Sequence, residues 1–402
     1  MVDLADVEAA YRVLRPVVKQ TPLERSKTFS EMTDADLYLK LENLQTTGSF
    51  KLRGAYNKIY QLSDAAKRRG VICASAGNHA QGVAHAAALL DVASTVYMPL
   101  YAPPTKIIAT RSYGATVILE GESYDDAHAA AVQHAKRDDL TFVPAFNDPD
   151  VIAGQGTIGL EMHRDLEDID VVLVPVGGGG LISGVALALK QLQPDVTVIG
   201  VEAEGAQAML RSLQRGKLTP LTSMSTIADG IAVKHPGELT FKLVQHYVDD
   251  MVTVTDEELA RTLYMLLQRA KLVVEPAGAA GLAAVLCGTV SYPGKNVVTV
   301  ISGGNINLLL LTQAIERGMM QHELLARFAV TVPDKPHMLS RMLDALAALN
   351  VNVQSISHDR TTTSVPIGHV KIIVTFQTLG GEQIQEVEQA LQDHDLPYER
   401  LL

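Results

Sequence analysis

Short apolar segments alternate with longer helical patterns over most of the chain. The predicted strands cover residues 71–74, 94–98, 115–119, 170–176, 196–202 and 297–301. The predicted helices cover residues 51–61, 78–91, 104–113, 123–137 and 180–192. Fully apolar strands separated by helices are typical of parallel sheets that are covered on both faces. Because one series precedes residue 150 and another follows it, the pattern predicts an α/β fold of two lobes with a cleft between them.

The residues from 327 onward follow a different pattern. Strands are predicted at 327–334, 351–360 and 369–378, helices at 337–350 and 382–394, and a last extended segment at 397–402. The first of these helices is amphipathic, with an apolar face made of Met338, Leu339, Met342, Leu343, Leu346 and Leu349. The βαββαβ order predicts a small ferredoxin-like module. We expect a main domain at 1–318, with a small lobe at about 45–150 inserted in the large one, a linker at 319–326 and the module at 327–402.

Composition narrows the class of protein. Of the 402 residues, 47% are hydrophobic and 20% are charged, so the chain is able to form a buried core and general disorder is excluded. The formal net charge of −11, without a basic run, argues against nucleic acid and membrane partners. Two cysteines cannot form a disulfide framework or a thiolate metal cluster. No apolar run approaches the ~20 residues of a membrane span, and the N-terminus is unlike a signal peptide. We expect a cytoplasmic protein.

Lys51 has an unusual sequence context. It follows Gly48, Ser49 and Phe50 in TTGSFKLRGA, and therefore lies in the first turn of a predicted helix that begins after a tight turn. A lone lysine is most often an exposed helix residue. Near a helix N-terminus and apolar walls, however, its pKa would be lowered, which suits an amine that attacks carbonyl groups.

Four consecutive glycines, residues 177–180, follow the predicted strand at 170–176 and begin a helix. Backbone N–H groups at such a junction converge on an anion at the positive end of the helix dipole. The run is not a nucleotide P-loop, because no GK[ST] follows, and not a dinucleotide fingerprint, because Ile182 stands where the third glycine is required. A flexible turn is the alternative, but four glycines cost much chain entropy, and we favour a phosphate cradle.

Two further loops and one carboxylate complete the pattern. SAGNHAQG at 75–82 offers a hydroxyl, a close backbone approach and an amide to a carboxylate, with helix capping as the alternative, especially for His79. In ISGGNIN at 301–307, Ser302 either donates to a heterocyclic nitrogen or caps a helix. Glu275 in VVEPAGAA is compatible with a helix-start carboxylate alone. Together with the lysine and the glycines, these loops indicate a pyridoxal phosphate site.

The motifs SFKLRGA, SAGNHAQG, VGGGGL and SGGN, in this order and spacing, resemble those of the fold type II pyridoxal phosphate enzymes. Over residues 5–318 the chain is most similar to the threonine dehydratase branch, with serine racemase and serine dehydratase as relatives. The C-terminal module resembles an ACT regulatory domain. A threonine dehydratase with a single ACT domain would account for the whole chain.

The resemblance implies how pyridoxal 5'-phosphate would be held. Lys51 would bind the cofactor covalently and act as the general base, Phe50 would pack beside the ring, and Asn78 would donate to the phenolic oxygen. The residues implied to hold the phosphate are Gly177, Gly178, Gly179, Gly180 and Leu181. Ser302 would meet the pyridine nitrogen, and a hydroxyl there leaves that nitrogen largely unprotonated. The resulting weaker electron sink suits β-elimination.

The resemblance also implies a substrate loop and shows three departures. The residues implied to bind the substrate are Ser75, Ala76, Gly77, His79, Gly230 and Glu275. Ala76 stands where the racemase has a serine that acts as second base, so racemisation should be weak. A racemase-like metal site would need carboxylates at positions 202 and 208. Glu202 is present, but Ala208 cannot bind a cation, and we therefore expect no required metal. In the ACT-like module, His337 stands where glycine is usual and would fill or reshape an amino-acid effector pocket.

The implied reaction is conversion of L-threonine to 2-oxobutanoate and ammonia, with L-serine as a slower substrate. An L-serine or 3-hydroxyaspartate dehydratase, or a serine racemase, of the same fold remains the alternative, since only the resemblance and the ACT-like tail favour threonine. A non-catalytic amino-acid sensor is a third reading, which the retained Lys51 disfavours. The resemblance also implies a homodimer or homotetramer.

Overall fold

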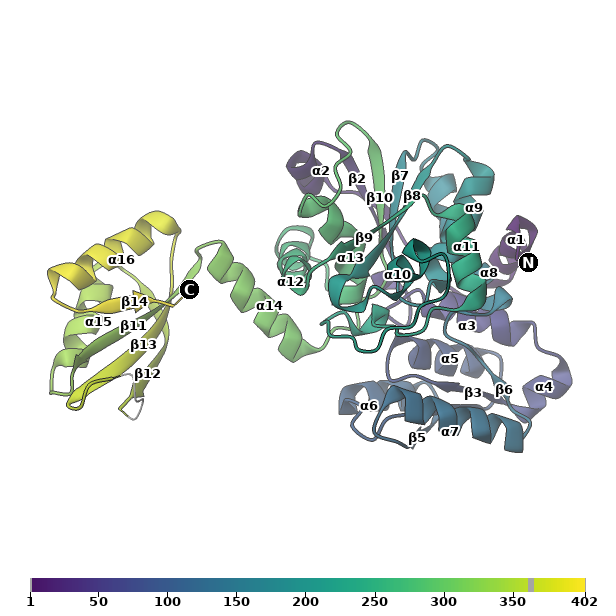
Figure 1. Ribbon diagram of the computed structural model, residues 1–402, viewed down its shortest axis with the longest axis horizontal. Coiled ribbons are helices and arrows are strands. Elements are labelled where there is room, and N and C mark those ends of the chain that lie inside the picture. Colours follow the sequence, from purple (N-terminus) through teal and green to yellow (C-terminus); the bar gives the residue numbers. More distant parts are fainter. Residues whose placement is uncertain (1, 361–364, 402) are drawn as a thin grey trace. The chain divides into compact units, whose positions relative to one another are not determined.

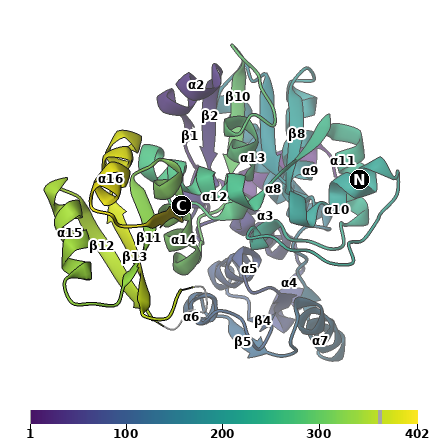
Figure 2. The ribbon, with the colours of Figure 1, turned by 60° about the vertical axis from the view of Figure 1, so that its left-hand side comes forward.

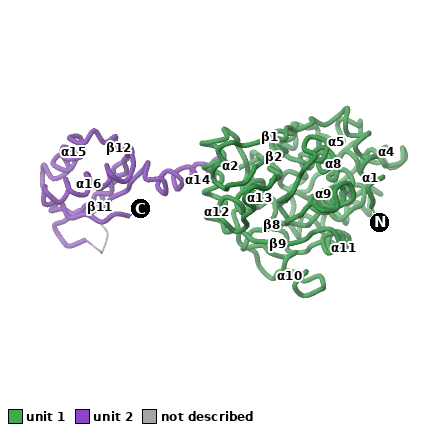
Figure 3. The backbone as a smooth tube through the Cα atoms, turned by 90° about the horizontal axis from the view of Figure 1, so that it is seen from above, with its two compact units in different colours: residues 1–307 green, residues 308–402 purple. Residues whose placement is uncertain are grey.

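The computed structural model describes residues 2–360 and 365–401, which form two compact units, residues 1–307 and 308–402 (Figure 3). The first unit contains two separate sheets and the second contains one (Figure 1). The helices of the first unit are α1 (Leu4–Leu14), α2 (Lys27–Thr33), α3 (Lys51–Tyr60), α4 (Asp64–Arg69), α5 (Asn78–Leu89), α6 (Pro104–Ser112), α7 (Tyr124–Arg137), α8 (Pro149–Asp165), α9 (Gly180–Leu192), α10 (Ala208–Gln214), α11 (Glu238–Tyr247), α12 (Asp256–Met265) and α13 (Pro276–Leu286).

The larger sheet has the strand order β1-β2-β10-β7-β8-β9. Its strands are β1 (Leu23–Arg25), β2 (Asp36–Leu41), β10 (Asn296–Ile301), β7 (Val171–Pro175), β8 (Thr197–Ala203) and β9 (Asp250–Val254). All neighbours run parallel except β1, which is antiparallel to β2. In β7, Val172 and Val174 pack with α9, while a Cβ on Gly281 of α13 would meet Leu173. Since successive strand residues face opposite sides, helices cover both faces of this sheet.

The smaller sheet is entirely parallel, in the order β5-β4-β3-β6. Figure 2 labels two of its strands, β4 and β5. Its strands are β3 (Val71–Ala74), β4 (Ser94–Met98), β5 (Thr116–Leu119) and β6 (Thr141–Phe142). The two lobes meet where α3 crosses α8. A Cβ on Gly54 would lie 2.7 Å from the carbonyl oxygen of Val151, and one on Gly154 would lie 2.7 Å from that of Arg53. This close crossing fixes the position of α3, whose first residue is Lys51.

The second unit begins with α14 (Leu308–Gln321), which spans the predicted boundary at residue 318. An antiparallel sheet follows, in the order β12-β13-β11-β14. Its strands are β11 (Leu325–Pro333), β12 (Asn352–Asp359), β13 (His369–Gln377) and β14 (Tyr398–Arg400), and its helices are α15 (Met338–Ala348) and α16 (Gly381–Asp393). On α15, Met342 and Leu346 are buried as expected, but Leu339 is 37% exposed because it lies at the edge of the apolar face.

These sheets confirm the predicted α/β class and the βαββαβ order of the C-terminal module. Across residues 2–360 and 365–401, the helices are all too short or too polar to cross a lipid bilayer.

Candidate active site

Lys51 is held at the start of α3 by the loop that precedes it. Gly48 turns the chain with a φ of +71°, and the backbone N–H of Phe50 then donates to the carbonyl of Ser302 (3.2 Å). The Lys51 amine donates to the carbonyl of Ala145 (3.1 Å) and lies 5.0 Å from the centre of the Phe50 ring. The residue is partly exposed, yet protein atoms surround its amine, and this burial lowers the pKa to about 8.

The glycine run adjoins this amine. Phe146 follows Ala145 directly, and its side chain would collide with a Cβ on Gly178 and lie 2.8 Å from one on Gly180. Gly179 has a φ of +90° and caps α9, a helix that has no side-chain cap among the described residues. Thr240 supports the run from behind by donating to the carbonyl of Gly178 (2.7 Å). The first N–H groups of α9 are therefore left for a ligand rather than for a side chain.

The SAGN loop begins α5 directly after β3. The Ser75 hydroxyl accepts from the N–H of Gly77 (3.2 Å), while Gly77 itself is the N-cap of α5 and provides no side-chain cap. A Cβ on Gly77 would meet no atom within 4 Å, so the start of this helix faces open space. Ala76 is partly exposed and packs at the edge of the small-lobe core.

His79 lies in the first turn of α5 but points into the protein. Its Nε2 is 2.9 Å from the carbonyl of Val143, and the residue is buried. Burial, with a smaller contribution from the charge of Lys51, lowers the pKa of His79 to about 3. The ring is therefore neutral, and only the backbone of His79 is available to a carboxylate.

Glu275 and Asn78 join the two lobes at the ends of α13 and α5. The Asn78 amide donates from Nδ2 to Glu275 Oε1 (2.6 Å). Glu275 is 5% exposed, and Gly230 lies beside it, since a Cβ there would be 3.4 Å from the same oxygen. Ser302 is buried at the end of β10, and the next residue, Gly303, has no room for a side chain beside Glu275.

Burial raises the pKa of Glu275 to about 7, and the negative charge of Asp229 acts in the same direction. The hydrogen bond from Asn78 and the positive charges of Lys106 and Lys51 oppose the shift. Glu275 is thus a carboxyl group that titrates near neutral pH inside the site.

The structure therefore gathers all the sequence motifs at one place. The loop before Lys51 is hydrogen-bonded to the SGGN loop, and Asn78 of the SAGN loop is hydrogen-bonded to Glu275. The glycine run lies against Phe146, the residue that follows Ala145. Three supporting residues, Ala145, Phe146 and Thr240, were not found from the sequence, since no motif contains them. Asn305 was also given no role, although it lies within the ISGGNIN segment.

Glu202 does not lie in this site. Its carboxylate accepts from the backbone N–H groups of Met209 (2.9 Å) and Leu210 (2.8 Å), and burial raises its pKa to about 7. In the part of the chain that the structure describes, no three His, Cys, Asp or Glu residues are grouped to hold a metal ion. The absence of a metal requirement stays a prediction.

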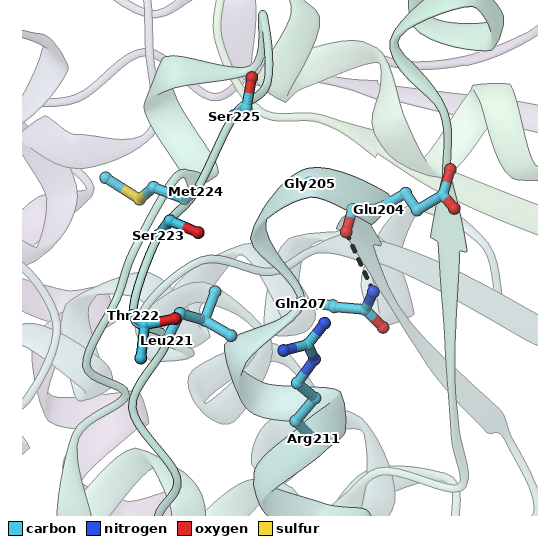
Figure 4. Close-up of a pocket in the computed structure, with 9 residues that line it drawn as sticks. All are labelled: Glu204, Gly205, Gln207, Arg211, Leu221, Thr222, Ser223, Met224 and Ser225. Carbon is cyan, nitrogen blue, oxygen red and sulfur yellow. Dashed lines mark hydrogen bonds between the residues drawn. The ribbon is translucent and has the colours of Figure 1, made fainter.

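A surface pocket of about 280 Å³ lies elsewhere in the large lobe (Figure 4). Figure 4 shows Arg211 beside Gln207, whose amide donates to the carbonyl of Glu204 (3.0 Å). The pocket contains none of the predicted site residues, and most of its side chains are exposed. We assign no function to it.

Comparison with known proteins identifies the class. The family model of the pyridoxal-phosphate dependent enzymes matches residues 14–303, and that of the ACT domain matches residues 326–395. The chain therefore belongs to the pyridoxal-phosphate dependent enzymes, of fold type II, and ends in an ACT domain.

Individual relatives cover nearly the whole chain. It is 49% identical to an L-threonine ammonia-lyase of Thermotoga maritima over 391 residues, 97% of each protein. It is 46% identical to one of Geobacter sulfurreducens over 379 residues, 94% of each. Among solved structures, the processed threonine deaminase isoform 2 of Solanum lycopersicum has a TM-score of 0.75 and 40% identity, over 78% of this chain and 91% of that one. Maize serine racemase has a TM-score of 0.75 and 34% identity, over 80% and 99%.

The residues present fit pyridoxal 5'-phosphate. The glycine run has no room for side chains and stands at an uncapped helix N-terminus, as a phosphate requires. The Lys51 amine lies close by with a lowered pKa, which suits a covalent bond to an aldehyde. At Gly77 an added Cβ would meet no atom within 4 Å, so the backbone there is open to a ligand.

Proposed function

We propose that this protein is an L-threonine ammonia-lyase that converts L-threonine to 2-oxobutanoate and ammonia, with L-serine as a secondary substrate. The observation that carries the proposal is the amine of Lys51, which is held by Ala145 next to the glycine run. The names of the two bacterial relatives support threonine as the substrate.

In this proposal, pyridoxal phosphate when bound supplies a ring that stabilises negative charge at the substrate α-carbon. Lys51 would be the residue to which it is attached, and Phe50 would pack beside the ring. Gly177, Gly178, Gly179, Gly180 and Leu181 would hold the phosphate. Asn78 would donate to the phenolic oxygen, and Ser302 would meet the ring nitrogen.

Lys51 is also the proposed general base. A pKa of about 8 leaves a useful fraction of the amine neutral near physiological pH, and only the neutral amine is able to accept the α-proton. The carbonyl of Ala145 orients the amine, and the packing of Phe50 limits the access of water.

The substrate carboxylate is proposed to bind the residues at the start of α5, namely Ser75, Ala76, Gly77 and His79. Since His79 is neutral and bonded to Val143, backbone N–H groups and the Ser75 hydroxyl supply the attraction, strengthened by the helix dipole. Gly230 and Glu275 line the same site from the large lobe.

Ala76 favours elimination over racemisation. A racemase needs a second base on the face of the substrate opposite to the lysine, and a methyl group cannot carry a proton. A serine racemase therefore remains a weaker second candidate, supported by the likeness to the maize enzyme.

The test is to supply L-threonine and L-serine separately and follow release of oxo acid and ammonia, with Lys51→Ala as control. Chiral analysis of the remaining serine measures racemisation in wild type and in Ala76→Ser. Threonine turnover that survives Lys51→Ala would contradict the proposal, as would D-serine formation by wild type as fast as deamination.

We further propose a cytoplasmic homodimer or homotetramer whose ACT domain is the part that responds to an amino-acid effector. His337 is the N-cap of α15 and has a φ of +75°, a conformation that favours glycine. The effector is proposed to bind at the loop that His337 ends. His337→Gly should enlarge any response of activity to isoleucine or valine. Light scattering measures the oligomeric state.

A further inference from the structure

Three polar side chains from different parts of the chain form a continuous hydrogen-bonded row in the active site. Asn305, in the loop after β10, donates from Nδ2 to Asn78 Oδ1 (2.8 Å) and to the carbonyl of Thr47 (2.8 Å). Asn78 in turn donates from its own Nδ2 to Glu275 Oε1 (2.6 Å). Asn305 and Asn78 are partly buried, and Glu275 is buried.

The backbone carbonyl of Thr47 determines the direction of every bond in this row. A carbonyl only accepts hydrogen bonds, so the atom of Asn305 that faces it must be the nitrogen. The second N–H of that nitrogen reaches Asn78, which must therefore present its oxygen. The nitrogen of Asn78 is then on the other side, where it donates to the carboxylate of Glu275.

An asparagine amide is nearly symmetric in shape, and in isolation it is able to turn over with little cost. Here the turned amide would place its nitrogen against the N–H of Asn305 and its oxygen against the carboxylate of Glu275. The contact with Asn305 would be repulsive at any pH, and the contact with Glu275 would be repulsive while that carboxyl group is ionised. The two neighbours therefore select one orientation of Asn78 from opposite sides.

We propose that Asn305 and Glu275 are positioning residues that fix the Asn78 amide with its nitrogen available to the phenolic oxygen of the cofactor. The inference rests on the proposed function, in which Asn78 donates to that oxygen. The Asn78 nitrogen has two N–H groups, and Glu275 takes one of them. The other is the donor left for the cofactor.

Two glycines leave room for this row. A Cβ on Gly48 would lie 2.5 Å from Asn305 Oδ1, and a Cβ on Gly303 would lie 3.2 Å from Asn78 Nδ2 and collide with Glu275. Gly303 also accepts a hydrogen bond at its carbonyl from the N–H of Glu275 (3.1 Å). The backbone on both sides is thus fitted closely to the three side chains.

If Asn305 only linked two loops, its replacement would give a different result from the loss of a positioning residue.

The matched control is Asn43→Ala. Asn43 lies beside Gly304, and its amide donates to the carbonyl of Val273 (3.2 Å), which is not part of the row. Losing it removes one side chain–backbone bond and leaves the row intact.

The experiment compares wild type, Asn305→Asp, Asn305→Ala and Asn43→Ala as holoenzymes. Asn305→Asp keeps the shape but is unable to donate to Thr47 or Asn78 when ionised, and Asn305→Ala removes the side chain without adding charge. Equilibrium dialysis gives the affinity for pyridoxal phosphate, and the visible absorbance of the bound cofactor is titrated against pH. The pH midpoint of this absorbance change depends on which group donates to the phenolic oxygen. If Asn305 only linked two loops, its replacement would not shift this midpoint.

We expect both Asn305 variants to bind pyridoxal phosphate about 10-fold more weakly and to shift the absorbance midpoint, because a hydrogen bond to a charged oxygen is worth about that factor. Asn43→Ala should match wild type in both measurements. If Asn305→Asp does not fold, Asn305→Ala carries the same test.

Wild-type affinity and midpoint in the Asn305 variants would overturn the inference, as would an equal loss in Asn43→Ala. If wild type itself binds no pyridoxal phosphate, the proposed function fails instead, so the two failures are distinguishable.

Discussion

Lys51 and Arg53 are two residues apart on α3, but the protein surrounds them in opposite ways. Arg53 belongs to a buried ion-pair cluster made of Lys40, Glu42, Arg53 and Glu161, each at most 2% exposed. Arg53 lies 2.8 Å from Glu42 and 2.7 Å from Glu161, which also pairs with Lys40 at 2.7 Å. Among the described residues, the Lys51 amine donates to the carbonyl of Ala145 and lies against the Phe50 ring, but it forms no ion pair.

The pKa shifts follow from this difference. Burial alone would lower the pKa of Arg53, but the charges of Glu42 and Glu161 outweigh it and raise the pKa. For Lys51, burial outweighs the charge of Glu275, and the pKa falls to about 8. One helix thus carries a cation that is locked in its charged form and an amine that is free to lose its proton. The ion pairs of Arg53 stabilise the position of α3, whereas the Lys51 amine, which is able to lose its proton, is suited to chemistry.

The largest effect should come from removing the unpaired amine. Lys51→Ala should reduce threonine turnover by about 10³-fold or more, because both the covalent attachment and the general base are lost. The matched control is Lys58→Ala on the same helix, where the amine is paired with Asp148 (2.7 Å) and Asp150 (2.9 Å). Oxo-acid release measures both, and comparable losses would show that any lysine on α3 matters to the same degree.

The next effect should be on stability. Arg53→Met should lower the free energy of unfolding by about 3–5 kcal/mol, because it leaves Glu42 and Glu161 buried without their shared cation. Arg53→Lys should cost less, since it keeps the charge but not the two-pronged geometry. Denaturant unfolding measures both variants. A cost for Arg53→Met below about 1 kcal/mol would mean that solvent or rearrangement compensates these carboxylates.

The two regions also differ in how far the sequence could predict them. Lys51 was singled out because its loop is a local motif, in which Gly48 and Phe50 stand close to it in the sequence. Arg53 lies in the same motif but was not singled out, because its partners come together only in the fold: Glu42 directly follows β2, and Glu161 belongs to α8. Asn305 was overlooked for the same reason, since its role depends on Thr47 and Asn78.

For the fold, too, locally encoded elements could be predicted from the sequence, and elements that depend on distant contacts could not. The apolar strands β3, β4, β7, β8 and β10 were predicted to within two residues, because burial on both faces leaves continuous apolar runs. The helices α5, α6 and α9, which follow β3, β4 and β7, were predicted equally well, whereas α10 and α14, which follow β8 and β10, were not predicted. Helix α8 was not predicted, and its glycine-rich sequence gives a weak helical signal. Gly154 and Gly156 are there for close packing against α3 and α9, which is a property of the assembled lobes.

Glu275 is a buried carboxyl group whose effect on stability should depend on pH. Its pKa is about 7 in the folded protein against an ordinary value of 4.5, so the folded state holds the proton more tightly than the unfolded state does. Its contribution to stability is then fully present below pH 4.5 and is lost as the pH rises through about 7. Glu275→Gln cannot ionise. Between these pH values it should gain about 2–3 kcal/mol relative to wild type, from the difference of about 2.5 pH units.

The measurement is the free energy of unfolding of the cofactor-free protein at several pH values, for wild type and Glu275→Gln. The control is Glu161→Gln, whose carboxylate is held ionised, since Arg53 and Lys40 outweigh the effect of burial and lower its pKa. That variant should be less stable than wild type throughout this range. A constant difference between wild type and Glu275→Gln from pH 5 to pH 8 would show that Glu275 does not titrate there.

The smallest effect on stability should come from an ion pair at the protein surface. Lys190 on α9 lies 2.8 Å from Asp249, with side chains that are 19% and 41% exposed. Lys190→Ala should cost less than about 1 kcal/mol, because water solvates both charges and Asp249 keeps its hydrogen bond from the N–H of Val198. High salt should reduce this small cost further, whereas the cost of Arg53→Met should persist. If the two variants lose stability equally at low and high salt, burial is not what separates the ion-pair cluster from the surface, and the contrast between Arg53 and Lys51 needs another cause.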